Sequence, residues 1–235
     1  MDATAEILID GELGKVPLRE VSIELLLRCD PIRSFRWRHG QRHLPGWYWS
    51  ATDRKHIAYE SQLELARLRL ADFDPEVVAI RSQPFRLTGR DSAGKERRHI
   101  PDFAVVHRDG LVRIINVKPA ERLKEVKIRE ALDWAHGIFE ANGFATELWS
   151  GETPEVLANI AFLSSCRNPA LFSGEDIATA TRVLDPNSTF ECAESASRDA
   201  GIGEPRPVLL HLLWRGDVVT DLTQTLGPTS LLKKS

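Results

Sequence analysis

The sequence predicts an α/β domain followed by a smaller module made mainly of helices. Between about residues 61 and 149 the hydrophobic pattern changes in the order helix, three strands, helix, strand. After Ser150 the pattern indicates several helices and few strands. The 235 residues, 42% hydrophobic and 28% charged, are enough to bury one large core or two smaller ones. We therefore expect a first domain over residues 1–150, with its core at about 57–150, and a second domain over 151–235.

The α/β pattern begins with a helix that Ser61 can cap and that runs to about Ala71, before Asp74-Pro75. The segments that follow are rich in β-branched and apolar residues and are separated by turn residues, which favours strands. The strands are expected at Val77–Leu87, Arg98–His107 and Leu111–Lys118, with turns at Gly89–Lys95 and at Arg108-Asp109-Gly110. A long amphipathic helix over about Glu121–Ala141 and a strand over Phe144–Trp149 complete the domain.

The module after residue 150 is predicted as short helices that lead into a short strand. The helices are expected at about Pro154–Leu163, Glu175–Leu184, Cys192–Ala200 and Pro207–Trp214, and the strand at Val218–Leu222. Helices leading into a short hairpin-like end are the outline of a winged-helix module. Residues 1–30 carry no clear pattern and receive no assignment.

Composition and charge exclude several classes of protein. The longest clear apolar run, Val208–Trp214, is far too short for a membrane span and is interrupted by His211. The acidic start, Met1–Asp10, lacks the basic region of a secretory signal. The three cysteines are far apart and odd in number, which fits reduced thiols in a cytoplasmic protein better than a zinc site or disulfides. The net charge of -3 gives no indication of nucleic-acid binding.

One local stretch is nevertheless basic and aromatic. Between Pro31 and His56 the sequence has six cations against the single acid Asp53, and four aromatic residues are interleaved with them: Trp37, Trp47, Tyr48 and Trp49. The cations are Arg33, Arg36, Arg38, Arg42, Arg54 and Lys55. Such a stretch can bind phosphates and stack on bases. The alternative is a surface strand whose tryptophans belong to the core.

A candidate for chemistry lies on the second and third strands. Pro101-Asp102 stands on one and Asn116-Val117-Lys118 ends the other, while Glu64 lies on the preceding helix. Mg²⁺ prefers carboxylate and carbonyl oxygens, and a water that it acidifies can attack a phosphodiester. A nearby lysine can position that water or neutralise charge on the phosphate. The alternative is a surface hairpin with solvated charges.

The hairpin turn decides whether these groups can meet. A two-residue Asp109-Gly110 turn would send Lys118 to the face opposite Asp102. A three-residue loop, Arg108-Asp109-Gly110, with its glycine left-handed, pairs Asp102 with Asn116 and brings Lys118 to the same face. We expect the three-residue loop.

A family resemblance rests on four short motifs. They are Ser61-Gln-Leu-Glu64-Leu-Ala66, Ile80-Arg-Ser-Gln83-Pro84, Pro101-Asp102-Phe103 and Asn116-Val117-Lys118-Pro119. Together they resemble the TnsA family of heteromeric transposase endonuclease subunits, over roughly Tyr48–Trp149, and Pro207–Leu226 resembles the winged-helix-like tail of some members. The resemblance implies a restriction-endonuclease-like core, of the PD-(D/E)xK superfamily, and cleavage of double-stranded DNA at transposon ends with a DDE-type transposase and an ATPase regulator.

Carried over by motif, the resemblance implies roles for individual residues. Glu64 and Asp102 would be the metal carboxylates, the Val117 carbonyl a further ligand for Mg²⁺ (or Mn²⁺ as its substitute), and Lys118 the catalytic lysine. Asn116 stands where the wider superfamily usually has a carboxylate, which weakens metal binding without excluding activity. Gln83 and Asn116 are assigned as supporting residues, Glu60 as an alternative ligand, and Arg36, Arg38, Arg42, Arg97 and Arg98 as DNA contacts.

Two other patterns are interpreted as structural. Gly89–Lys95 has the spacing of a phosphate-binding loop, but Glu96 follows it in place of serine or threonine, so we interpret it as a hairpin turn. The seven histidines show no zinc-ligand spacing, and His99 and His107 are expected at the surface or satisfied within the fold. Two alternative functions remain: a stand-alone defence or DNA-processing nuclease, and a catalytically weak DNA-binding or assembly protein.

Overall fold

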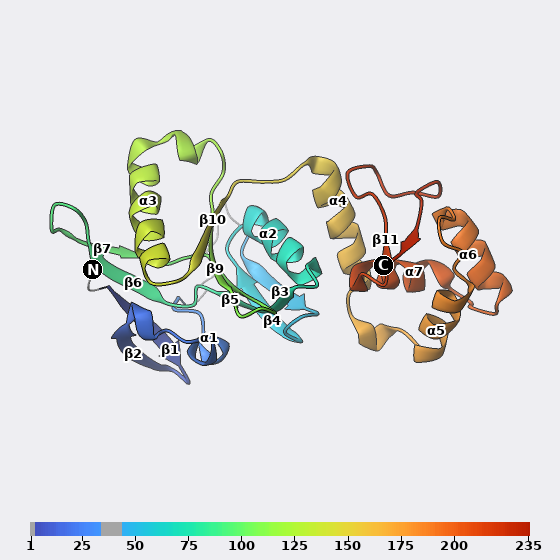
Figure 1. Ribbon diagram of the computed structural model, residues 1–235, viewed down its shortest axis with the longest axis horizontal. Helices are drawn as coiled ribbons and strands as arrows, with labels where there is room; N and C mark the ends of the chain where they lie inside the picture. The colour runs from blue at the N-terminus through green and yellow to red at the C-terminus, as the bar shows by residue number, and fades with distance from the viewer. Residues whose placement is uncertain (1–2, 34–43) are drawn as a thin grey trace. The chain divides into compact units, whose positions relative to one another are not determined.

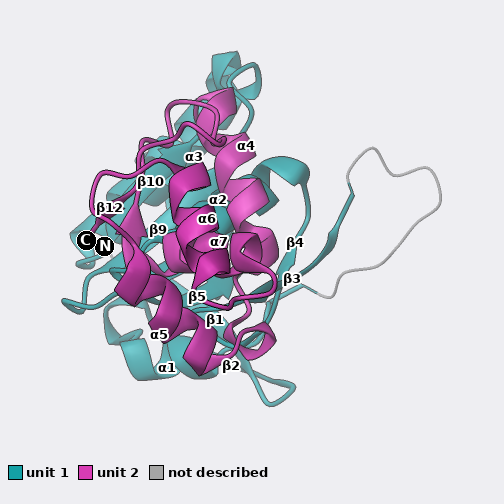
Figure 2. Cartoon of the chain, turned by 90° about the vertical axis from the view of Figure 1, so that its right-hand side faces the viewer, with its two compact units in different colours: residues 1–151 teal, residues 152–235 magenta. Residues whose placement is uncertain are grey.

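The computed structural model describes residues 3–33 and 44–235 (Figure 1). The chain divides into two compact units, residues 1–151 and 152–235 (Figure 2). Among the described residues, no helix has the length and apolar character needed to cross a membrane.

The first unit is built on a mixed four-stranded sheet in the order β10-β9-β8-β5. Its strands are β5 (Val77–Ser82), β8 (Phe103–His107), β9 (Val112–Val117) and β10 (Ala145–Trp149). Strand β8 runs antiparallel to both β5 and β9, whereas β10 runs parallel to β9 because a helix connects them. Two helices belong to this sheet, α2 (Gln62–Phe73) and α3 (Val126–Ala141). The mixed α/β character predicted for this domain is confirmed.

A second sheet of four antiparallel strands, in the order β2-β1-β6-β7, packs beside it. Its strands are β1 (Thr4–Ile9), β2 (Glu12–Pro17), β6 (Arg86–Arg90) and β7 (Glu96–His99). A short 3-10 turn, η1 (Leu18–Glu20), and helix α1 (Ile23–Arg28) follow β2, and a separate hairpin is formed by β3 (Gly46–Ser50) and β4 (Lys55–Tyr59). The N-terminal residues left unassigned from the sequence therefore form a hairpin and a helix of this unit.

Two predicted strands are wrong as continuous elements. Val77–Leu87 is divided between β5 and β6, and Arg98–His107 between β7 and β8, so that each segment serves two sheets. The first break lies at Gln83, whose φ is +44°, followed by Pro84, which has no N–H for a sheet. The second break contains Pro101. The interpretation of Gly89–Lys95 as a hairpin turn is confirmed at residues 91–95, between β6 and β7.

The helix expected from Glu121 is also shorter than predicted. Residues 122–124 form a 3-10 turn, η2 (Arg122–Lys124), and α3 begins at Val126 after Glu125, whose ψ of 114° is extended. From there α3 is amphipathic, and its buried face contains Ala135, Ile138 and Phe139. These side chains join Ala104 and Ile114, directly opposed on β8 and β9, in one buried cluster. Figure 1 shows α3 beside β10 and β6.

The β3–β4 hairpin is fastened to the central sheet through its turn. Asp53 accepts hydrogen bonds from Arg81 Nη1 at 2.6 Å and from the Ile80 N–H at 2.7 Å. Arg81 also donates to the carbonyl oxygens of Leu26 and Leu27, at the end of α1. Because the Arg81 and Asp53 side chains are both buried and hydrogen-bonded, this ion pair holds three elements in place.

The second unit is mainly helical, with α4 (Pro154–Leu163), α5 (Gly174–Val183), α6 (Phe190–Asp199) and α7 (Pro205–Arg215). Two 3-10 turns, η3 (Ser164–Cys166) and η4 (Pro169–Leu171), and a two-stranded sheet of β11 (Val218–Val219) and β12 (Lys233–Lys234) complete it. Helix α7 is buried from Val208 to Trp214 and ends at Gly216, whose φ is +76°. The strand predicted at Val218–Leu222 is only two residues long: Val218 pairs with Lys234 and Val219 with Lys233 on β12.

Candidate active site

The candidate site lies where β8 begins and β9 ends. Phe103 pairs with Ile115 and Ala104 with Ile114, a register that places Asp102 opposite Asn116. The connecting loop is the three-residue one, and Gly110 has a φ of +87°. The predicted register is therefore confirmed, and Asp102 and Lys118 lie together.

Asp102 is held firmly by its neighbours on both sides. Its Oδ2 accepts a hydrogen bond from the Val117 N–H at 2.6 Å, and its own N–H donates to the Ile115 carbonyl at 3.1 Å. On the other side, the Gln83 N–H donates to the Asp102 carbonyl at 2.9 Å. The carboxylate is thus positioned by backbone groups of two strands and is only 13% exposed.

The Lys118 ammonium lies beside the Asp102 carboxylate. Its Nζ lies 3.3 Å from Asp102 Oδ2 and 2.9 Å from the Val117 carbonyl oxygen, while its N–H donates to Trp149 on β10. The side chain is 34% exposed, so the ammonium keeps contact with solvent. One cation thus already lies against two of the oxygens that the resemblance assigns to a metal ion.

Glu64 belongs to the first turn of α2. Its Oε2 accepts from the Glu60 N–H at 2.8 Å and its Oε1 from the Ser61 hydroxyl at 3.1 Å, while Ser61 caps the Glu64 N–H. Burial, with a smaller contribution from the charge of Asp102, raises the pKa of Glu64 to about 7. Two carboxylates therefore lie near enough to repel each other, a situation that a cation would relieve.

Among the described residues, Asn116 forms side-chain hydrogen bonds with two histidines and with neither Asp102 nor Lys118. It is fully buried, and its Oδ1 lies 2.6 Å from His99 Nε2 while its Nδ2 lies 2.9 Å from His136 Nε2. Burial lowers the pKa of both histidines. The expectation that His99 is satisfied within the fold is correct. Sequence reasoning missed His136 because nothing in its spacing connects it to β9.

Gln83 lies beside the site with an unusual backbone. Its positive φ is a left-handed conformation, rare for a residue other than glycine, and its side chain is buried. Among the described residues its Oε1 has no hydrogen-bond partner. The backbone strain is held by two hydrogen bonds, from the Gln83 N–H to Asp102 and from the Ile32 N–H to the Gln83 carbonyl.

The residues expected to contact DNA are only partly described. Arg36, Arg38 and Arg42 lie outside the described residues. On or beside β7, Arg97 pairs with Asp91 at 2.7 Å and Arg98 with Glu96 at 3.0 Å. Because both guanidinium groups already have acidic partners, binding a phosphate would require them to exchange or share these partners. Trp47 on β3 is 60% exposed, whereas Tyr48 beside it is buried.

The donor groups fit a hard divalent cation in type. Glu64, Asp102 and the Val117 carbonyl supply oxygen ligands, and Mg²⁺ commonly binds one or two carboxylates and keeps several waters. Among the described residues there is no group of three or more His, Cys, Asp and Glu side chains suited to hold a metal. The set is therefore small, and solvent would have to complete it.

A comparison with protein families finds a match over the part of the chain that contains Asp102 and Lys118. Residues 74–150 match the family model of the TnsA-like endonuclease N-terminal domain. This segment is TnsA-like. The TnsA-like segment includes Gln83, Asp102 and Lys118, but Glu64 and the rest of α2 precede it. No curated protein matches the chain.

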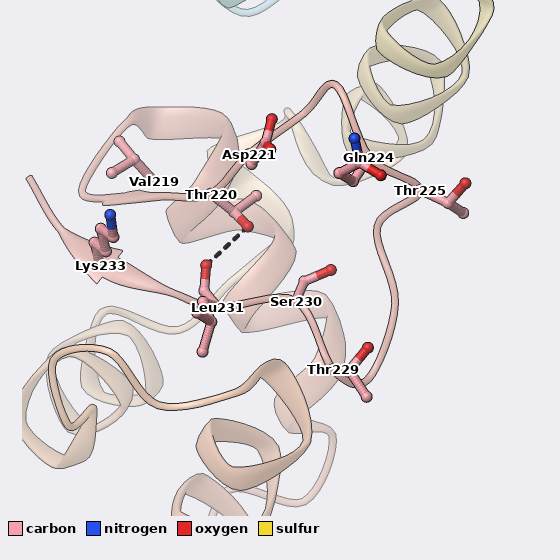
Figure 3. A pocket seen from close by; sticks show the side chains of 9 residues that line it. All are labelled: Val219, Thr220, Asp221, Gln224, Thr225, Thr229, Ser230, Leu231 and Lys233. Atoms are coloured by element: carbon pink, nitrogen blue, oxygen red, sulfur yellow. Dashed lines mark hydrogen bonds between the residues drawn. The ribbon is translucent and has the colours of Figure 1, made fainter.

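A separate hollow of about 740 Å³ belongs to the second unit and contains none of the TnsA-like residues (Figure 3). Its lining includes the hydroxyl groups of Thr220, Thr225, Thr229 and Ser230, together with Lys233. In Figure 3 these side chains surround the loop that connects β11 to β12, and Thr220 donates to the Leu231 carbonyl at 2.9 Å. The hollow is thus formed by a hydrogen-bonded loop.

Proposed function

We propose that the chain is a metal-dependent DNA endonuclease subunit that cleaves DNA at transposon ends together with a partner transposase. The observation that carries this proposal is the meeting of Asp102 and Lys118 within the TnsA-like segment. A TnsA-like endonuclease domain indicates a nuclease related to transposition. Metal dependence, the transposon-end substrate and the partners are the parts proposed here.

In this proposal Glu64, Asp102 and the Val117 carbonyl hold Mg²⁺, or Mn²⁺ in its place. When bound, the ion supplies an acidified water and neutralises charge on the scissile phosphate. Asp102 is already fixed by the Val117 N–H, so it binds without a search through rotamers. Lys118 exchanges its bonds to Asp102 and Val117 for the phosphate, where its charge stabilises the transition state.

The partners are assigned by the same resemblance. We propose double-stranded DNA as the substrate, a DDE-type transposase as the strand-transferring partner, and an ATPase as the regulator. Arg36, Arg38, Arg42, Arg97 and Arg98 are the proposed phosphate contacts. The second unit, with its buried helix α7, is proposed as a winged-helix-like contact for DNA or for a partner.

A cleavage assay tests the proposal. The full chain is incubated with DNA that carries transposon ends, with and without the candidate transposase, in Mg²⁺ or in EDTA. We expect nicks at the transposon ends that require both Mg²⁺ and the partner. Nicks that need Mg²⁺ but no partner would favour a stand-alone nuclease. DNA binding without any nicks would favour a DNA-binding or assembly protein. The small number of carboxylates in the site supports this second hypothesis.

A further inference from the structure

A chain of three hydrogen-bonded polar side chains, of which Asn116 is fully buried, has no role yet in the function proposed above. Asn116, on β9, lies between His99, on β7, and His136, on α3. The two contacts are 2.6 Å and 2.9 Å long, and Asn116 has no exposed surface. The chain therefore connects one strand of each sheet and the long helix.

The direction of these hydrogen bonds follows from the chemistry of the amide. Oδ1 can only accept, so His99 must carry its proton on Nε2. Nδ2 can only donate, so Nε2 of His136 must be bare and its proton must be on Nδ1. His136 is therefore neutral, and burial, which lowers the pKa of both histidines, favours the neutral form of His99 as well. An amide, with one acceptor and one donor group, satisfies two neutral histidines.

A carboxylate at this position could not do the same. It has no donor, so His136 would have to carry a proton on Nε2, by a change of tautomer or by taking up a second proton, before it could form the second hydrogen bond. The bare Nε2 of His136 would otherwise face a carboxylate oxygen, with two acceptors in contact. The amide at residue 116 therefore matches the two histidines, and this gives a physical reason for a position that lacks a carboxylate.

Val117, the residue after Asn116, bonds through its backbone to both Asp102 and Lys118. The Val117 N–H donates to Asp102, and the Val117 carbonyl accepts from Lys118. We propose that Asn116 is a positioning residue and not a metal ligand: anchored by His99 and His136, it fixes the Val117 peptide that holds Asp102 and Lys118. This inference rests on the proposed nuclease function for its effect on cleavage, but the hydrogen-bonded chain itself does not.

The first test compares two substitutions of His136 in the full chain. His136→Leu leaves the buried Nδ2 of Asn116 without an acceptor, and we expect cleavage to slow by about 10-fold, the lower end of the range for residues that orient ligands. His136→Gln keeps a neutral acceptor and should recover most of that rate. The dissociation constant for Mg²⁺, measured by calorimetry, should rise in His136→Leu together with the loss of rate and return toward the parental value in His136→Gln, because the Val117 carbonyl is a proposed ligand. Equal loss of rate in both variants would contradict the inference.

The second test uses Asn116→Asp and needs neither DNA nor activity. The ¹⁵N signals of the parent should show His136 as the neutral Nδ1–H form, and the substitution should convert His136 to a form that carries a proton on Nε2. Since both histidines then donate to the new carboxylate, it is not available to the ion, and Mg²⁺ affinity should change by less than about 3-fold. An unchanged His136 signal, or Mg²⁺ binding at least about 10-fold tighter, would overturn the inference. If the parent cuts no DNA, the proposed function fails while the histidine signals still decide this inference.

Discussion

Asp72 and Asp102 are two carboxylates of the same unit that are held in different ways. Asp72 is buried and accepts hydrogen bonds from Tyr48 Oη at 2.8 Å, Ser50 Oγ at 2.5 Å, and the N–H groups of Ala51 and Thr52. Both of its oxygens are used, and every donor belongs to one hairpin. Asp72 thus fixes the β3–β4 hairpin on α2 and has no capacity left for a ligand.

Asp102 is satisfied on one oxygen only. Its Oδ2 accepts from the Val117 N–H and from Lys118, whereas Oδ1 accepts no hydrogen bond among the described residues. The strained backbone of Gln83 lies directly beside it. The comparison teaches that local hydrogen bonding separates a carboxylate that completes a fold from one that remains available for chemistry.

The largest effect is expected at Asp102. Asp102→Ala should abolish Mg²⁺-dependent cleavage, because the site then retains only one carboxylate. The melting temperature should fall only slightly, since of the groups bonded to this carboxylate only the Val117 N–H and the partly exposed Lys118 ammonium lose their partner. Parallel nicking assays and thermal melts check both expectations. Cleavage at the parental rate would place the reaction elsewhere.

Lys118→Ala should slow cleavage on the order of 10²-fold, the usual scale for loss of a positioned catalytic group. Metal binding should be retained, because the ammonium now competes with the ion for Asp102 and the Val117 carbonyl. Calorimetry with Mg²⁺ beside single-turnover kinetics separates the two effects. Weaker Mg²⁺ binding in the variant would mean that Lys118 supports the metal ligands instead of opposing the ion.

Asp72→Ala should show the reverse behaviour. It removes the acceptor of two hydroxyls and two N–H groups, so we expect the free energy of unfolding to fall by about 3 kcal/mol. Below the lowered melting temperature, cleavage should stay within about 3-fold of the parent, because Asp72 does not contact the site. Urea unfolding monitored by circular dichroism provides the measurement. A loss of cleavage in a fully folded variant would break the distinction between the two carboxylates.

The smallest effect concerns pH and Glu64. Since burial raises the pKa of this carboxyl from 4.5 to about 7, the folded state holds its proton more tightly than the unfolded chain. The resulting stability is present below about pH 4.5 and is lost as the pH rises to about 7. Relative to Glu64→Gln, which does not titrate, the parent should therefore lose stability across this window and change little above it. Unfolding in EDTA at several pH values measures the difference, and a flat difference would show that Glu64 is solvated.

The sequence was sufficient where short-range patterns decide the structure. The capped start of α2 at Ser61, the left-handed Gly110 and the pairing of Asp102 with Asn116 all follow from a few neighbouring residues. The pattern of apolar residues also identified the buried helix α7. These features depend on the turn type and the side-chain period, which a single sequence displays.

Features that join distant segments could not be predicted. The hydrophobic content of Val77–Leu87 is that of one strand, but pairing with β8 on one side and β1 on the other divides it. The partners of Asn116 lie 17 and 20 residues away on other elements, and no local pattern relates an amide to two histidines. Likewise, the position of the β1–β2 hairpin depends on the pairing of β1 with β6, which is distant in the sequence.

That last pairing affects the order in which the chain can fold. Strand β1 precedes β6 by the length of several elements, and Thr4 must find Thr88. Closing so long a loop costs chain entropy before the new contacts can stabilise the structure, so we expect this step late in folding. Until then one edge of the β1–β2 hairpin has no partner, and such an edge can pair with another chain. During synthesis the β1–β2 hairpin emerges before β6, so it must wait for that strand before the second sheet can close.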